Sequence, residues 1–208
     1  MRRRGVLGNL FSRIVIIFKI ISLLSITVVA IVANPGSASA DDRCDPNSSY
    51  EGPYWWSGVG ATNANGGRTA LAVSPPWDSS SYAYIWSINY DLRQLWSFDC
   101  VGYSDYRQRD IYQVRLASSQ DSCLSDYGQG TAAVLDDCLP QASWQTWQQW
   151  ELVYLGQEWI PSEGVYRSTY AIRNSGSGLC LDVAGAATYN GATVVTWPCH
   201  GGPNQRWF

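Results

Sequence analysis

Five residues near the end of the chain have side chains suited to binding a ligand rich in hydroxyl groups. Asp182 is followed by Trp197, His200, Asn204 and Gln205. A carboxylate can accept hydrogen bonds from two adjacent hydroxyls, and such charge-assisted bonds are about twice as strong as neutral ones. An indole packs its face on apolar C–H groups and keeps its N–H available as a donor. These residue types fit a ligand that has both a hydroxyl edge and an apolar face.

The sequence contains little that is typical of catalytic or metal centres. It has one histidine, which excludes multi-histidine metal sites, and its six cysteines include no Cys-x-x-Cys pair of the kind found in zinc clusters. It also lacks a Gly-x-Ser-x-Gly nucleophile motif. A glycosidase needs two carboxylates about 5–9.5 Å apart, and nothing singles out such a pair among the 17 acidic residues. We expect no catalysis, metal or cofactor, and keep a glycosidase as the least favoured alternative.

Composition and charge exclude two further classes of protein. With 46% hydrophobic and 15% charged residues, the chain does not have the composition of a disordered protein. Residues 41–208 carry 17 acidic and nine basic residues, a formal charge of −8, which argues against binding nucleic acid. All 11 tryptophans follow residue 54, and no stretch after residue 40 shows sustained helical periodicity. This composition favours an all-β fold of one domain.

The first 40 residues have the pattern of a signal peptide. Three arginines open the chain, an apolar stretch follows from Ile20 to Ala33, and Ala38 and Ala40 fit a signal-peptidase site. A membrane anchor over about Ile14 to Ala33 is the alternative, but Lys19 interrupts an apolar span of the roughly 20 residues that crossing requires. We therefore expect a secreted, extracellular protein without a membrane span after cleavage. Residues 41–49 would form an N-terminal extension of the domain at 50–208.

A threefold repeat runs through residues 50–208. The motif Gln-x-Trp recurs at intervals of 54 and 57 residues, and a leucine in an apolar segment precedes its Gln by 23, 24 and 24 residues. The motif residues are Gln94, Trp96, Gln148, Trp150, Gln205 and Trp207, and the leucines are Leu71, Leu124 and Leu181. Two landmarks that repeat in step are a much stronger signal than one three-letter match. The repeats are about 50–108, 109–165 and 166–208.

Alternating apolar and polar residues predict strands at Tyr112–Leu116 and Tyr170–Asn174. The pair Asn190 and Gly191 predicts a two-residue hairpin turn, because both residue types adopt positive φ. Three copies of a roughly four-stranded unit predict a closed, pseudo-threefold barrel without exposed sheet edges. The three motif tryptophans would pack in its core.

The segment from Cys180 to Phe208 resembles the ricin B-chain type lectin repeat, and it is most similar to the bacterial carbohydrate-binding modules of that family. The resemblance implies a β-trefoil lectin of three Gln-x-Trp repeats. Repeats of the family are usually shorter, so the loops of this chain would be longer than those of typical family members. The family also continues its last strand beyond the position of Trp207, whereas this sequence stops one residue later, so we expect a short closing strand.

The resemblance also implies roles for the five residues of the third repeat. Asp182 would accept hydrogen bonds from two sugar hydroxyls, and Trp197 would stack on the sugar ring. His200 and Asn204 would bind outer hydroxyls, and Gln205 would support Asp182 or the backbone. The corresponding Asp position holds Ala72 in the first repeat and Ser125 in the second. Asp126 follows Ser125, and strand alternation would point its side chain to the opposite face unless a bulge intervenes.

Six cysteines in an exported chain indicate disulfides, and order alone allows 15 pairings. The resemblance implies bridges Cys180–Cys199 and Cys123–Cys138 within repeats. Cys44 and Cys100 would then pair and hold the N-terminal extension.

The sequence as a whole favours a secreted lectin that binds a neutral glycan or polysaccharide, such as one containing galactose or xylose, mainly through the third repeat. The alternative is a β-trefoil that binds proteins, as an inhibitor or adhesion factor, with a vestigial sugar site. The additional tryptophans could serve either core packing or such a second surface; they are Trp55, Trp56, Trp77, Trp144 and Trp147.

Overall fold

A computed structural model describes residues 56–57, 60–62, 68–74, 81–89, 91–140 and 145–208. The predicted signal peptide, the extension at 41–49 and Cys44 lie outside these residues, as do Trp55, Trp77 and Trp144. Within the described residues, no helix is long and apolar enough to cross a membrane.

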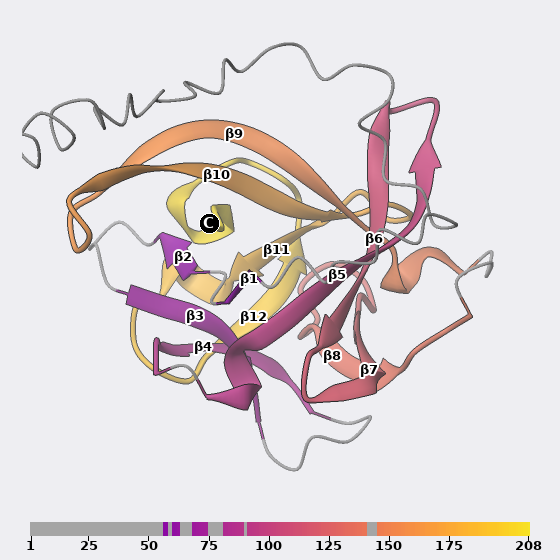
Figure 1. Cartoon of the computed structure of the whole chain (residues 1–208), viewed down its shortest axis with the longest axis horizontal. Coiled ribbons are helices and arrows are strands. Elements are labelled where there is room, and N and C mark those ends of the chain that lie inside the picture. Colours follow the sequence, from indigo (N-terminus) through magenta and orange to yellow (C-terminus); the bar gives the residue numbers. More distant parts are fainter. Residues whose placement is uncertain (1–55, 58–59, 63–67, 75–80, 90, 141–144) are drawn as a thin grey trace, which may run out of the picture. The chain divides into compact units, whose positions relative to one another are not determined.

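The described part of the chain is all-β, as predicted, with four short 3-10 helices between its strands. Antiparallel strands form a barrel-like sheet in the order β1-β5-β6-β9-β10 (Figure 1). Their bounds are β1 Trp56–Ser57, β5 Leu95–Ser104, β6 Arg109–Leu116, β9 Trp150–Ile160 and β10 Val165–Asn174. Each motif tryptophan pairs with an aromatic residue on the first strand of its own repeat. The pairs are Trp56 with Trp96, Tyr112 with Trp150, and Tyr170 with Trp207.

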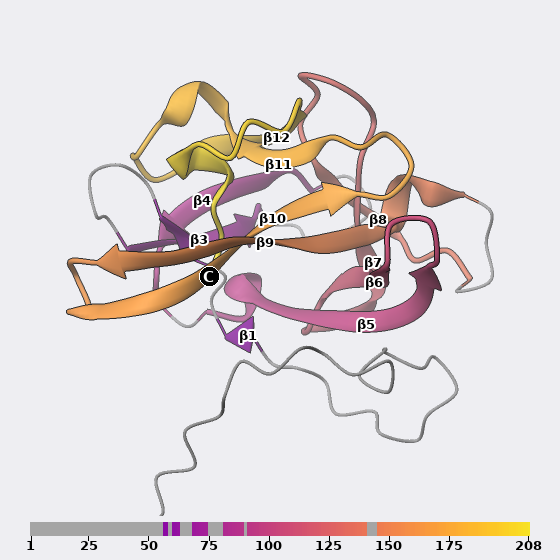
Figure 2. The ribbon, with the colours of Figure 1, turned by 90° about the horizontal axis from the view of Figure 1, so that it is seen from above.

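The remaining strands form one hairpin in each repeat. β3 (Arg68–Val73) pairs with β4 (Ala83–Ser87), β7 (Ser119–Ser125) with β8 (Val134–Asp137), and β11 (Cys180–Val183) with β12 (Ala192–Trp197). β2 (Gly60–Thr62) pairs with β3. Bridges join neighbouring hairpins: Ala192 to Ile85, Tyr82 to Val134, and Ala132 to Val195. In Figure 2 the β11–β12 hairpin lies on one side of the β9–β10 pair and β5 on the other.

The three motif tryptophans fill the centre of the core. All three are fully buried, and each indole Nε1–H donates to the carbonyl of the leucine that marks its repeat. The distances are 3.0 Å from Trp96 to Leu71, 2.9 Å from Trp150 to Leu124 and 3.3 Å from Trp207 to Leu181. A buried indole N–H needs such a partner, and the leucine strand supplies it. The constant spacing between leucine and motif therefore has a direct structural cause.

The motif glutamines hold the loop that precedes each of them. Gln94 Oε1 accepts from the backbone N–H of Asn89, Gln148 from that of Leu139, and Gln205 from that of His200. The side-chain amide of each glutamine donates to a backbone carbonyl at the end of its hairpin. Each glutamine is the last residue of a short 3-10 helix. These helices are η1 (Leu92–Gln94), η2 (Thr146–Gln148) and η4 (Pro203–Gln205). The loops next to the hairpins are thus fixed by the same residues that define the repeat.

One turn differs from the prediction. Asn190 and Gly191 do not form a two-residue hairpin turn, because the β11–β12 connection extends from Ala184 to Gly191 and contains the 3-10 helix η3 (Ala184–Ala186). Gly191 adopts φ +86° and Ala186 φ +51°, but Asn190 does not have positive φ. The longer connection places the side chain of Asn190 against β4, where its Oδ1 accepts from the backbone N–H of Ser87. Contact with the neighbouring repeat thus replaces the expected local turn.

Trp207 forms a single bridge, exchanging two backbone hydrogen bonds with Tyr170.

Candidate functional site

The β11–β12 hairpin and η4 bring the five predicted site residues together. Asp182 lies on β11 and Trp197 ends β12. Asp182 pairs with Val195, and Cys180 pairs with Trp197. Directly paired residues in antiparallel strands point to the same face, and alternate residues share it, so Asp182 and Trp197 share one face of the hairpin. His200 follows β12, and Asn204 and Gln205 lie in η4.

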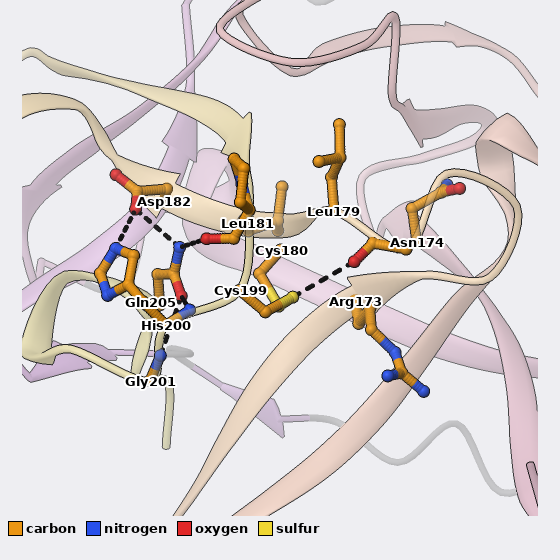
Figure 3. The surroundings of a disulfide bond; sticks show 12 residues. Arg173, Asn174, Leu179, Cys180, Leu181, Asp182, Cys199, His200, Gly201 and Gln205 are labelled. Carbon is orange, nitrogen blue, oxygen red and sulfur yellow. Dashed lines mark hydrogen bonds and ion pairs between the residues drawn. A yellow bond between two sulfur atoms is a disulfide. The ribbon is translucent and has the colours of Figure 1, made fainter.

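Three side chains converge on the carboxylate of Asp182, which is only 4% exposed. Asn204 Nδ2 donates to Oδ1 at 2.8 Å, and Gln205 Nε2 donates to Oδ2 at 2.8 Å. The His200 ring places Nε2 at 3.2 Å from Oδ2. Figure 3 shows His200 and Gln205 reaching Asp182 from the same side, next to the Cys180–Cys199 bridge. The predicted support of Asp182 by Gln205 is present in the structure, and Gln205 also binds the backbone.

These contacts leave Asp182 able to accept from a ligand. Each carboxylate oxygen has two acceptor positions. Oδ1 receives a side-chain bond from Asn204, and Oδ2 receives bonds from Gln205 and His200. His200 is about half exposed, so a ligand hydroxyl can take its place at Oδ2 while a second hydroxyl binds Oδ1. The buried Gln205 would keep the carboxylate in position during this exchange.

Trp197 provides an exposed aromatic surface beside Asp182. Its side chain is 43% exposed, although large aromatic residues are usually highly buried. The ring rests on the β7–β8 turn of the second repeat, where a Cβ built on Gly130 would lie 3.3 Å from its Cζ3. Because glycine has no side chain, the backbone of the second repeat can pack directly against the Trp197 ring.

Two disulfides restrain the same hairpins. Cys180 is bonded to Cys199, and Cys123 to Cys138, as the resemblance implied. The Cys180–Cys199 bridge joins β11 to the segment that carries His200. The pairing of Cys44 with Cys100 stays a prediction, because Cys44 lies outside the described residues.

The second repeat has neither a carboxylate at the position of Asp182 nor an aromatic ring at the position of Trp197. Ser125 occupies the position of Asp182, and Asp136 pairs with Cys123, which is the register position of Trp197. Tyr127 donates a 2.9 Å hydrogen bond to Asp136, and this bond raises the pKa of the Tyr127 hydroxyl. Asp126 points inward, where it accepts from Thr196 and Ser177 of the third repeat. It therefore links repeats and supplies no alternative acceptor at the surface.

The first repeat contains an exposed aromatic residue that was not predicted from the sequence. Trp86 pairs with Ala70 just as Trp197 pairs with Cys180, and it is 41% exposed. A signal was present in the sequence, because Trp86 precedes Gln94 by eight residues and Trp197 precedes Gln205 by the same number. The Asp position of the first repeat holds Ala72, so the pattern that marks the third-repeat residues is incomplete there. Among the described residues, no group of three His, Cys, Asp or Glu side chains could hold a metal ion.

Comparison with known proteins supports the fold and the third repeat. Residues 146–208 match the family model of the ricin-type beta-trefoil lectin domain-like proteins. The designed threefold-symmetric protein ThreeFoil is similar, with a TM-score of 0.57 and 24% identity over 75% of this chain and 96% of its own.

Two larger proteins contain a similar domain. The Polyporus squamosus lectin has a TM-score of 0.52 and 23% identity, over 77% of this chain and 49% of its own. An exo-β-1,3-galactanase from Clostridium thermocellum has a TM-score of 0.56 and 20% identity, over 73% of this chain and 29% of its own. This chain thus spans about half the length of the lectin and less than a third of the galactanase. The protein has a β-trefoil fold, and its residues 146–208 carry the ricin-type β-trefoil lectin-like pattern.

Proposed function

We propose that the protein is a secreted, non-catalytic lectin that binds neutral glycans through its third repeat. The observation that carries this proposal is the convergence of Asn204, Gln205 and His200 on Asp182 beside the exposed ring of Trp197. A sugar ring presents hydroxyls at its edge and C–H groups on its face. Asp182 would bind the hydroxyls as a charged acceptor, and Trp197 would pack on the C–H face.

The affinity of a single site of this kind should be modest. A dissociation constant of about 1 mM corresponds to roughly −4 kcal/mol and one of 1 μM to roughly −8 kcal/mol. We expect a value between these limits. Galactose- and xylose-containing glycans are the first candidates. The epitope bound to the Polyporus squamosus lectin, Neu5Aca2-6Galb1-4GlcNAc, contains galactose, which supports beginning the search there.

The decisive experiment is binding of the protein from residue 41 onward to a panel of glycans and polysaccharides, compared with Asp182→Ala. We expect the variant to lose most binding while its unfolding transition stays cooperative. Asp137→Ala is the matched control, because it removes an exposed carboxylate from β8. A folded wild-type protein that binds no glycan would contradict the proposal. Hydrolysis of a panel glycan that disappears on a carboxylate mutation would show an enzyme instead.

Protein binding is the second candidate, and the β9–β10 hairpin is the observation that favours it. Trp159 and Tyr166 pair across its strands with ring centroids 5.3 Å apart, and Tyr154 and Tyr170 pair at 5.6 Å. Trp159, Tyr166 and Tyr154 are exposed. Exposed aromatic clusters are typical of interaction surfaces. Failure of the glycan panel would make this hairpin the next surface to test.

A further inference from the structure

The first repeat contains a pocket at the position that corresponds to the third-repeat site. The residues that line it are Ala72, Tyr84, Trp86, Asn89, Asp91, Arg93 and Gln94. Ala72 is the register equivalent of Asp182, and Gln94 the equivalent of Gln205. The pocket is thus built on the same framework, although its strand carboxylate is missing.

The aromatic surface of this pocket is retained. Trp86 and Trp197 have almost the same exposure, 41% and 43%. Each also faces a glycine in the hairpin turn of an adjacent repeat. A Cβ built on Gly191 would lie 3.9 Å from Cζ3 of Trp86, as one built on Gly130 would lie 3.3 Å from Cζ3 of Trp197. Tyr84 packs edge-on against Trp86, with ring centroids 6.0 Å apart.

A carboxylate is present in the first repeat at a different position. Asp91 is the N-cap of η1, and the equivalent N-cap of η4 is Gly202. A Cβ at Gly202 would lie 2.8 Å from the His200 ring, so a side chain there would require His200 to move. In the first repeat Asn89 stands in the place of His200, since its backbone N–H donates to the motif glutamine in the same way. The first and third repeats therefore both have a carboxylate near the exposed tryptophan. In the third repeat the strand β11 supplies it, and in the first repeat the N-cap of η1 supplies it.

The Asp91 carboxylate is oriented by its neighbours. Its Oδ1 accepts from the backbone N–H of Arg93 at 3.1 Å, and its Oδ2 pairs with the Arg93 guanidinium at 2.6 Å. The hydrogen bond from the Arg93 side chain lowers the pKa of Asp91. A second acceptor position remains on each oxygen beyond these two bonds. Arg93 thus orients Asp91 much as Asn204 orients Asp182.

We infer that the first repeat is a second glycan-binding site, in which Asp91 replaces the missing strand carboxylate as acceptor and Trp86 stacks on the sugar ring. The ligand is a neutral sugar residue with two adjacent hydroxyls, as at the third repeat. This inference rests on the proposed function. The second repeat has neither element, because Asp136 occupies the aromatic position and Gln145 the N-cap of η2. The protein would therefore hold two sugars and could bind a branched or repeating glycan with increased avidity.

Titrations with a monovalent sugar from the panel separate the two sites. Asp182→Ala should keep weaker but measurable binding by calorimetry. Adding Asp91→Asn should reduce this residual affinity about tenfold or more, because a charge-assisted hydrogen bond is lost. Asparagine is also a good N-cap, so the fold of η1 should remain. Asp182→Ala with Asp136→Asn is the matched control and should bind like Asp182→Ala alone.

A spectroscopic readout locates the second site independently of affinity. The indole N–H signal of Trp86, assigned as the resonance missing in Trp86→Ala, should shift on titration of both the wild type and Asp182→Ala. Absence of any binding to folded Asp182→Ala, or residual binding that Asp91→Asn and Trp86→Ala leave unchanged, would overturn the second site but not the lectin. A wild-type protein that binds no sugar would overturn both.

Discussion

Asp182 and Glu151 are both buried carboxylates, but their partners differ in kind. Glu151 is fully buried and forms ion pairs with Arg107 and Arg173. Asp182 is bound by the neutral amides of Asn204 and Gln205 and by an exposed histidine. Two arginines hold both oxygens of the fully buried Glu151, so its acceptor capacity is used for structure. Of these two carboxylates, only Asp182 lies next to an exposed ring, so it is the one of the pair suited to a ligand.

Replacing Glu151 by Gln should destabilise the protein, because two guanidinium groups lose their counter-charge. Breaking a buried ion pair typically costs about 3–5 kcal/mol. We expect about 1–3 kcal/mol here, since both arginines reach solvent and are partly screened. The measurement is urea-induced unfolding. Glu163→Gln, which breaks the more exposed pair with Arg167, is the control and should cost less than about 1 kcal/mol.

Replacing Gly130 by Ala should weaken sugar binding by displacing Trp197. The added Cβ would lie 3.3 Å from the ring, which is tighter than ordinary contact. Gly128→Ala is the matched control. Gly128 also has positive φ, at +106°, but nothing lies within 4 Å of its Cβ position. Both variants should lose some stability through backbone strain. Equal affinities of the two variants in calorimetric titrations would contradict this role of Gly130.

At the scale of elements, the same β-hairpin unit serves different purposes in the three repeats. In the third repeat β11 and β12 present Asp182 and Trp197, whereas β7 and β8 present Ser125 and Asp136 at the same register positions. The β7–β8 unit acts as a support, because its turn carries Gly130 below Trp197 and Asp126 binds Thr196. Each hairpin thus depends on its neighbour, and the site is a product of two repeats.

The two disulfides allow the stabilising and site-ordering roles to be separated. Converting Cys180 and Cys199 to Ser opens a link of 19 residues, and the same change at Cys123 and Cys138 opens one of 15. Each should lower the free energy of unfolding by about 2–4 kcal/mol. Only the first should also weaken sugar binding, because it releases the segment that carries His200. Urea unfolding and glycan titration test this, and an equal loss of affinity in both variants would contradict it.

At the scale of the whole molecule, pseudo-threefold symmetry is strict in the core and broken at the surface. Trp96, Trp150 and Trp207 make the same hydrogen bond to a leucine carbonyl. The surface positions instead hold different residues in each repeat. Core packing tolerates little change in volume, whereas exposed positions are free to vary. One framework can therefore carry the site proposed in the third repeat, the rearranged site inferred in the first, and neither in the second.

Trp→Phe substitutions at the three motif positions should have similar effects on stability. Each removes a buried hydrogen bond and leaves a cavity, which together should cost about 2–4 kcal/mol. Urea unfolding of the three single variants measures this. Losses that differ by more than about 2 kcal/mol would show that the repeats do not contribute equally. Double variants should deviate from additivity, since the three rings share one core.

The sequence by itself determined the all-β class and the repeat register, because these depend on local patterns that recur at fixed spacing. The two disulfides within repeats followed from the resemblance to a known family, and the binding roles of the five third-repeat residues remain proposals. The signal peptide and the Cys44–Cys100 bridge remain predictions. Tertiary structure alone decided the inward position of Asp126, the longer connection at Asn190 and the support of Trp197 by Gly130, because these contacts join different repeats.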